Sequence, residues 1–191
     1  EMLRREDPDW GEGGGNIIVK PEQSRLTKSE TGGGSALLLK DFTMKRNYDT
    51  WFAGASEFFV KVGSVDDFTA TTEAELKLYN PKVTDFMVVV KRNQLGKPQP
   101  FNALLISDWN EQMTHCAFMI TEDDGGTQTA WKCTALVRIK SMSYGVEIEL
   151  PLNTRDDIVW RGQLAWGWME SNSGKPSHFG DVSLTFDLVE Y

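Results

Sequence analysis

The chain has 191 residues with 28 acidic and 20 basic side chains, so its formal charge is −8 at pH 7. This length suits one domain that buries a sizeable core without metal ions or disulfides. A pI near 4.8 argues against a nucleic-acid-binding protein, because neutralising phosphates requires clustered Lys and Arg.

The first 35 residues differ in composition from the rest. Glycine triplets at 13–15 and 32–34 flank a short apolar segment, 16–20. Gly-rich segments behave as flexible coil, because they bury too little side chain to offset the entropy of ordering. We therefore divide the chain into a flexible Gly-rich tether with one short strand, residues 1–35, and a single β domain, residues 36–191.

From residue 36 onward, apolar and polar residues alternate, which predicts β-strands. Segment 70–80 is helix-like in composition, but its apolar positions step by two, so we predict a strand there as well. The predicted strands are, in chain order, 58–62, 70–80, 86–91, 102–107, 116–121, 129–140, 146–150, 158–168 and 182–188. Turn signals separate about ten strands in all, which indicates an all-β fold, an antiparallel two-sheet sandwich or jelly roll.

The two cysteines, Cys116 and Cys133, flank a turn signal at Asp124-Gly125. A two-residue turn would place them directly opposite each other at a non-hydrogen-bonded position, where side chains approach closely. A cross-strand disulfide and two buried free thiols both fit this pattern. A register shift of one residue would remove the pairing.

Catalytic motifs are scarce in this sequence. His115 is next to Cys116, but neighbours on a strand point to opposite faces, so they cannot form a thiol–imidazole pair. Ser56 lacks the flanking glycine of a nucleophile elbow, and no zinc-ligand spacing occurs. We predict that the protein is not an enzyme and requires no cofactor. A carboxylate-dependent hydrolase is the enzymatic alternative.

Adjacent acidic residues occur at three turns, and such pairs either mark solvated loops or bind calcium. The order of Lys40-Asp41, an apolar strand at 58–62 and then Asp66-Asp67 is similar to the opening of calcium-dependent phospholipid-binding sandwich domains. That resemblance implies calcium at Asp66 and Asp67, with a membrane or a protein as partner.

The tryptophans offer a second binding hypothesis. Trp160, Trp166 and Trp168 share one parity, which predicts core positions. Trp51 with Asp49, and Trp109 with Asp108 and Asn110, fall in predicted loops, where an indole could stack on a sugar ring while the polar side chains bind its hydroxyls. Each loop tryptophan could instead plug an end of the sandwich.

An acidic start, a glycine-rich spacer and a Trp-rich β body together resemble secreted or lipid-anchored surface domains of Gram-negative bacteria. The resemblance implies a secreted, periplasmic or cell-surface protein whose targeting segment has been removed. No apolar run approaches the roughly 18 residues of a transmembrane helix. The predicted function is a non-catalytic binding or adhesion module for a carbohydrate or a surface protein. The alternatives are a calcium-dependent membrane- or partner-binding sandwich and a structural or assembly subunit.

Overall fold

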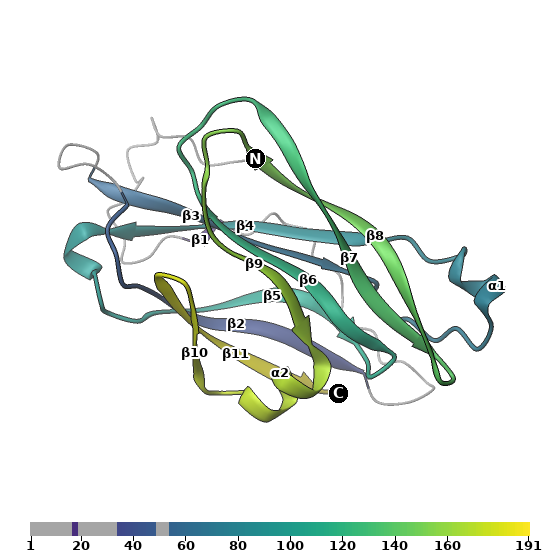
Figure 1. The fold of residues 1–191 in the computed structure, drawn as a ribbon. Coiled ribbons are helices and arrows are strands. Elements are labelled where there is room, and N and C mark those ends of the chain that lie inside the picture. Colours follow the sequence, from purple (N-terminus) through teal and green to yellow (C-terminus); the bar gives the residue numbers. More distant parts are fainter. Residues whose placement is uncertain (1–16, 19–33, 49–53) are drawn as a thin grey trace.

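The computed structural model describes residues 17–18, 34–48 and 54–191 (Figure 1). Strands dominate these residues, and the helices are short. The elements are, in order, β1 (Ile17–Ile18), β2 (Ser35–Met44), β3 (Ala55–Ser64), α1 (Glu73–Leu76), β4 (Lys82–Lys91), η1 (Arg92–Gln94), β5 (Gln99–Trp109), β6 (Met113–Glu122), β7 (Gln128–Ile139), β8 (Met142–Asn153), β9 (Asp157–Ala165), α2 (Trp166–Asn172), β10 (Pro176–Phe179) and β11 (Val182–Glu190).

The strands form two antiparallel sheets, which confirms the predicted all-β sandwich. The smaller sheet has the order β10-β11-β2-β5. The larger sheet follows the path β1-β4-β3-β6-β7-β8, and β9 also pairs with β6. β2 and β11 pair from Ser35↔Glu190 to Met44↔Val182, so the two ends of the β domain lie side by side.

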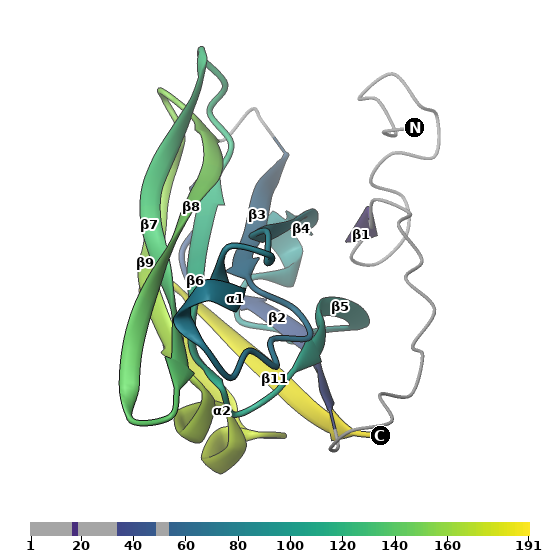
Figure 2. The ribbon, with the colours of Figure 1, turned by 90° about the vertical axis from the view of Figure 1, so that its right-hand side faces the viewer.

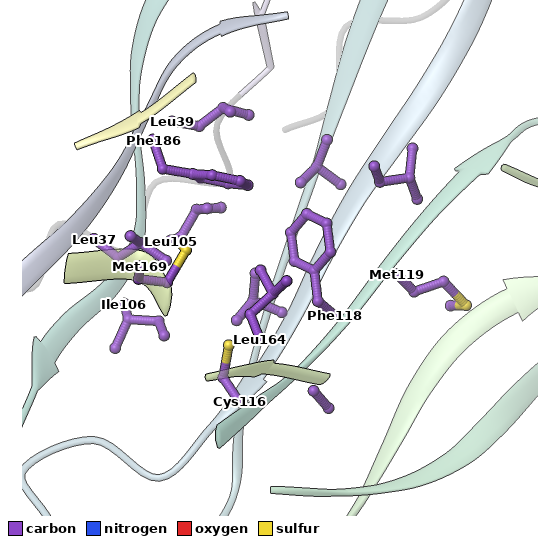
Figure 3. Close-up of a cluster of buried hydrophobic side chains, with 14 of the residues drawn as sticks. Leu37, Leu39, Leu105, Ile106, Cys116, Phe118, Met119, Leu164, Met169 and Phe186 are labelled. Atoms are coloured by element: carbon purple, nitrogen blue, oxygen red, sulfur yellow. The ribbon is translucent and has the colours of Figure 1, made fainter. Parts of the chain in front are cut away.

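The main core lies between the two sheets and consists of large apolar side chains (Figure 3). Phe118 on β6 is at its centre, because its ring centroid lies 5.5 Å from Phe179, 5.7 Å from Phe186 and 5.8 Å from Trp160. Phe42 and Phe58 pack across the two sheets with centroids 4.9 Å apart. The alternating apolar residues that predicted these strands are therefore the side chains on the face of each strand that packs against this core.

A third layer covers the other face of the larger sheet. β6 and β7 pair only at Met113↔Val137 and His115↔Leu136, beyond which β9 occupies that edge of β6. The β7–β8 hairpin leaves the sheet and forms an outer layer beside β3 and β6 (Figure 2). A Cβ atom on Gly63 of β3 would lie 2.6 Å from Cγ2 of Ile148 on β8, so the hairpin packs directly on β3. As a result, β3 is covered on both faces.

Two predicted strand segments are wrong. Residues 70–80 contain the short helix α1, whose first turn is held by Thr71 N–H donating to Glu75 Oε2 at 2.7 Å. The predicted strand 158–168 ends at Ala165, and Trp166 and Trp168 lie on α2. Residues two apart point in different directions on a helix, so Trp166 packs against the core while Trp168 is partly exposed. No helix in the described ranges is long and apolar enough to cross a bilayer.

The disulfide alternative is also wrong, because Cys116 and Cys133 are free thiols. Residues 123–127 do not form a two-residue turn. Instead, Thr154 N–H donates to Thr127 O at 2.9 Å, which ties this loop to the β8–β9 loop. β7 thereby separates from β6, so Cys116 pairs with Leu164 and Cys133 with Ile148.

Candidate functional site

Trp109 is a core residue. The prediction that it lies in a loop is wrong, since it is the last residue of β5 and is 0% exposed. Its Nε1–H donates to Met113 O at 2.6 Å, and its ring packs edge-on against Trp166 with centroids 5.4 Å apart. A satisfied indole N–H permits this burial. A fully buried ring has no free face on which a sugar can stack.

Asn110 and Asp108, the predicted polar partners of Trp109, have different roles. Asn110 Nδ2 donates to Phe68 O at 2.9 Å, and its Oδ1 accepts from Gln112 N–H at 3.0 Å. The first bond joins the β3–α1 loop to the β5–β6 turn, and the second lies within that turn. Asp108 lies on β5 and contacts the other acidic candidates described next. The second predicted pair, Trp51 and Asp49, lies outside the described residues.

The structure brings Asp66, Asp67 and Asp108 together at one end of the sandwich. Asp66 Oδ2 accepts from Lys82 Nζ at 2.9 Å and from Ser107 Oγ at 2.6 Å. Its Oδ1 accepts from Ser64 Oγ at 2.5 Å. Both carboxylate oxygens of Asp66 are thus engaged by protein donors.

Asp67 and Asp108 form a carboxyl pair beside this ion pair. Asp67 has a φ of +53° and its N–H donates to Asp108 O at 3.1 Å. Desolvation, and then the charge and hydrogen bond of Asp67, raise the pKa of Asp108. Burial and the negative charge of Asp108 raise the pKa of the Tyr191 hydroxyl to about 12.

This acidic cluster fits neither calcium binding nor glycoside hydrolysis well. The Lys82 ammonium lies 2.9 Å from Asp66 Oδ2, so this carboxylate already has a cationic partner in the protein. Within the described ranges, no group of three or more His, Cys, Asp or Glu could hold a metal ion. Glycosidases require carboxyl groups about 5 Å or more apart to flank the scissile bond, whereas Asp67 and Asp108 are hydrogen-bonded to each other.

A buried lysine under the β7–β8 hairpin is the most unusual polar residue of the fold. Lys61 on β3 is 3% exposed, and its Nζ donates to Thr121 Oγ1 at 3.1 Å. The same Nζ lies 5.0 Å from the centroid of the Phe59 ring. Burial lowers the pKa of Lys61, while the carboxylates of Asp85, Asp156 and Asp123 oppose that shift.

Sequence analysis missed Lys61 as a special residue. The available signal was a single lysine in the apolar strand segment Phe58-Phe59-Val60-Lys61-Val62. In a strand with one exposed face such a lysine is unremarkable, because it faces water. Only the hairpin that covers this face makes it unusual.

An open groove on the surface lies between β4 and the open end of the β7–β8 hairpin. The groove has a volume of about 610 Å³, within the range of small-molecule sites. It is lined by Val83, Gln128, Thr129, Ala130, Glu149 and Pro151. Half of these side chains are apolar and half carry an amide, a hydroxyl or a carboxylate. Lys132 Nζ lies 3.4 Å from Glu149 Oε1 in an exposed ion pair beside it.

Comparison with protein-family models, with curated proteins and with solved structures finds no match to this chain. Functional inference therefore depends on the geometry of the chain itself.

Proposed function

We propose that this protein is a non-catalytic binding module whose ligand occupies the groove between β4 and the β7–β8 hairpin, and that the ligand is a carbohydrate. The observation that carries the proposal is the lining of the groove. Gln128, Thr129 and Glu149 offer hydrogen-bonding groups beside apolar surface from Val83 and Pro151. A saccharide has the matching pattern, with hydroxyl groups on its rim and C–H groups on its ring faces.

The state of the thiols supports a non-catalytic role. Burial raises the pKa of the Cys116 thiol to about 12 and also raises the pKa of Cys133. The thiolate is the nucleophilic form of cysteine, so neither side chain is activated at neutral pH. His115, the neighbour of Cys116, has its Nδ1 3.1 Å from Thr114 Oγ1.

A glycan array with the full chain, followed by calorimetry on the best saccharide, tests the proposal. Glu149→Ala and Gln128→Ala should each weaken binding by roughly tenfold, because each removes a ligand hydrogen bond worth about 1–2 kcal/mol. Glu147→Ala is the matched control. Glu147 is an exposed residue two positions away on β8 that does not line the groove.

Two outcomes contradict the proposal. The first is an array with no bound saccharide. The second is a loss of affinity in Glu147→Ala as large as that in Glu149→Ala, which would reflect acidic charge in general and no specific contact in the groove.

A further inference from the structure

Apart from the short β1, β4 is the outermost strand at one end of the larger sheet. Its apolar segment is the most apolar among the strands at sheet edges. Residues 86–90 are Phe, Met and three Val in succession. Phe86, Val88 and Val90 face the main core and are buried, and Val89 is buried on the opposite face. An apolar edge strand exposes unpaired backbone groups and is a site for strand addition unless another segment covers it.

The N-terminal strand β1 covers part of this edge. It pairs antiparallel with β4 at Ile17↔Val88 and Ile18↔Met87. β4 has ten residues, and β1 pairs with two of them. Such a short pairing contributes little stability, because two-stranded contacts are marginal without an extensive packed face.

The connection between β1 and the β domain permits exchange between molecules. Residues 19–33 separate β1 from Gly34, and these fifteen residues can span roughly 50 Å when extended. Gly34 is anchored at the other end, since its carbonyl accepts from Tyr191 N–H at 3.2 Å. The same backbone hydrogen bonds form whether β1 comes from the same chain or from another copy.

We propose that the β4 edge is a strand-acceptor site and that its partner is β1 of a second copy of this chain. Reciprocal exchange gives a closed two-fold dimer, because each copy donates one strand and accepts one. The exchanged dimer contains the same β1–β4 contacts as the monomer, so the protein concentration determines how much dimer forms. A strand tethered by a short linker has an effective concentration in the millimolar range, and exchange becomes extensive as the protein approaches that concentration.

Disulfide trapping with two single-cysteine variants of the full chain, both made in a Cys116→Ala, Cys133→Ala background that removes the two native thiols, tests this proposal. One chain carries Ile18→Cys and the other carries Met87→Cys, at positions that β1 and β4 pair directly. Mixed at about 1 mM and oxidised, the two chains should form an interchain disulfide that peptide mapping assigns to positions 18 and 87. Dilution before oxidation should reduce the yield at least tenfold.

Val83→Cys in place of Met87→Cys is the matched control. Val83 is on the same strand and is more exposed than Met87, but four residues out of register, so its yield should be far lower. Ile18→Cys with Met87→Cys in a single chain provides a second measurement. A disulfide within that chain, with none between the mixed chains, overturns the exchange. Absence of both disulfides overturns the proposal as well, because β4 then does not accept this strand.

Discussion

The two interlayer spaces of this molecule differ in chemistry although they share β3 and β6. Between the sheets, Phe58 and Phe118 pack in a core of mostly apolar side chains. Under the β7–β8 hairpin, Lys61 and Thr121 are buried with charged carboxylates nearby. The first space is closed by a whole sheet and the second by a single hairpin that joins the sheet at two residue pairs.

The difference shows what each layer contributes. An apolar core stabilises the fold through the area it removes from water. A buried charge costs free energy unless partners compensate for it, so the hairpin layer stabilises the fold less per residue. We expect the hairpin to be the layer that opens more readily, and it is also the layer that borders the groove.

Truncation of one core side chain in each layer should give the largest effect. Phe118→Ala should lower the free energy of unfolding by about 3–5 kcal/mol, and Leu150→Ala on β8 by about 2–3 kcal/mol. Both side chains are fully buried, so their exposure is matched. Urea denaturation measures the two losses. An equal or larger loss for Leu150→Ala would show that the hairpin layer is as important to stability as the main core.

Contact between β3 and β8 should be sensitive to a single methyl group. Gly63→Ala should lower the free energy of unfolding by about 1–3 kcal/mol, because its Cβ would overlap Ile148 Cγ2. The loss should shrink when Ile148→Ala is also present, and a double-mutant cycle measures this coupling. Gly145→Ala on β8 is the control, since its Cβ would lie 3.6 Å from Thr134 Cγ2. If the losses caused by Gly63→Ala and Ile148→Ala are simply additive, the direct packing of residue 63 against Ile148 is contradicted.

The charge in the hairpin layer should give a smaller, pH-dependent effect. Burial depresses the folded-state pKa of Lys61 below its unfolded value of 10.5. Its contribution to stability is therefore fully present above pH 10.5 and is lost as pH falls through the folded pKa. Relative to Lys61→Met, the wild type should gain stability as pH rises through that window, as measured by urea denaturation at each pH. Lys132→Met, at an exposed lysine of the hairpin, should show no such trend. If the difference in the free energy of unfolding between the wild type and Lys61→Met does not change with pH, a depressed pKa of Lys61 is excluded.

Thiol labelling should distinguish the layers without any change in stability. Cys116 is fully buried at the core (Figure 3), whereas Cys133 is half-buried and lies on β7 of the hairpin. A thiol reagent should modify Cys133 in the folded protein and Cys116 only after unfolding, as followed by mass spectrometry. Equal rates at the two cysteines would show that both become exposed in one global event.

Much of the fold was predictable because alternation records which face of a strand is buried. Val182, Leu184 and Phe186 alternate with polar residues, and β11 lies where this pattern predicts. Residues 70–80 follow the same period but lack a neighbouring strand, so they form a helical turn and loop. Pattern alone does not reveal whether a partner strand is present.

The site was less predictable because it depends on contacts between distant segments. Trp109 was predicted as an exposed ring on the basis of Asp108 and Asn110 beside it, yet those polar neighbours bond to the protein itself. The groove combines Val83 with residues of β7 and β8 that follow it by 45 positions or more. No local motif marks that combination, because it arises where the hairpin leaves the sheet.

The pairing of β2 with β11 has a consequence for synthesis on the ribosome. β2 ends at Met44 and β11 begins at Val182, so 137 residues lie between them. At about 5–20 residues per second, β2 waits roughly 7–30 seconds for this neighbour. During that interval β2, which carries the fully buried Leu37 and Leu39, lacks one of its two neighbouring strands. The nascent chain therefore exposes an apolar strand for most of its translation.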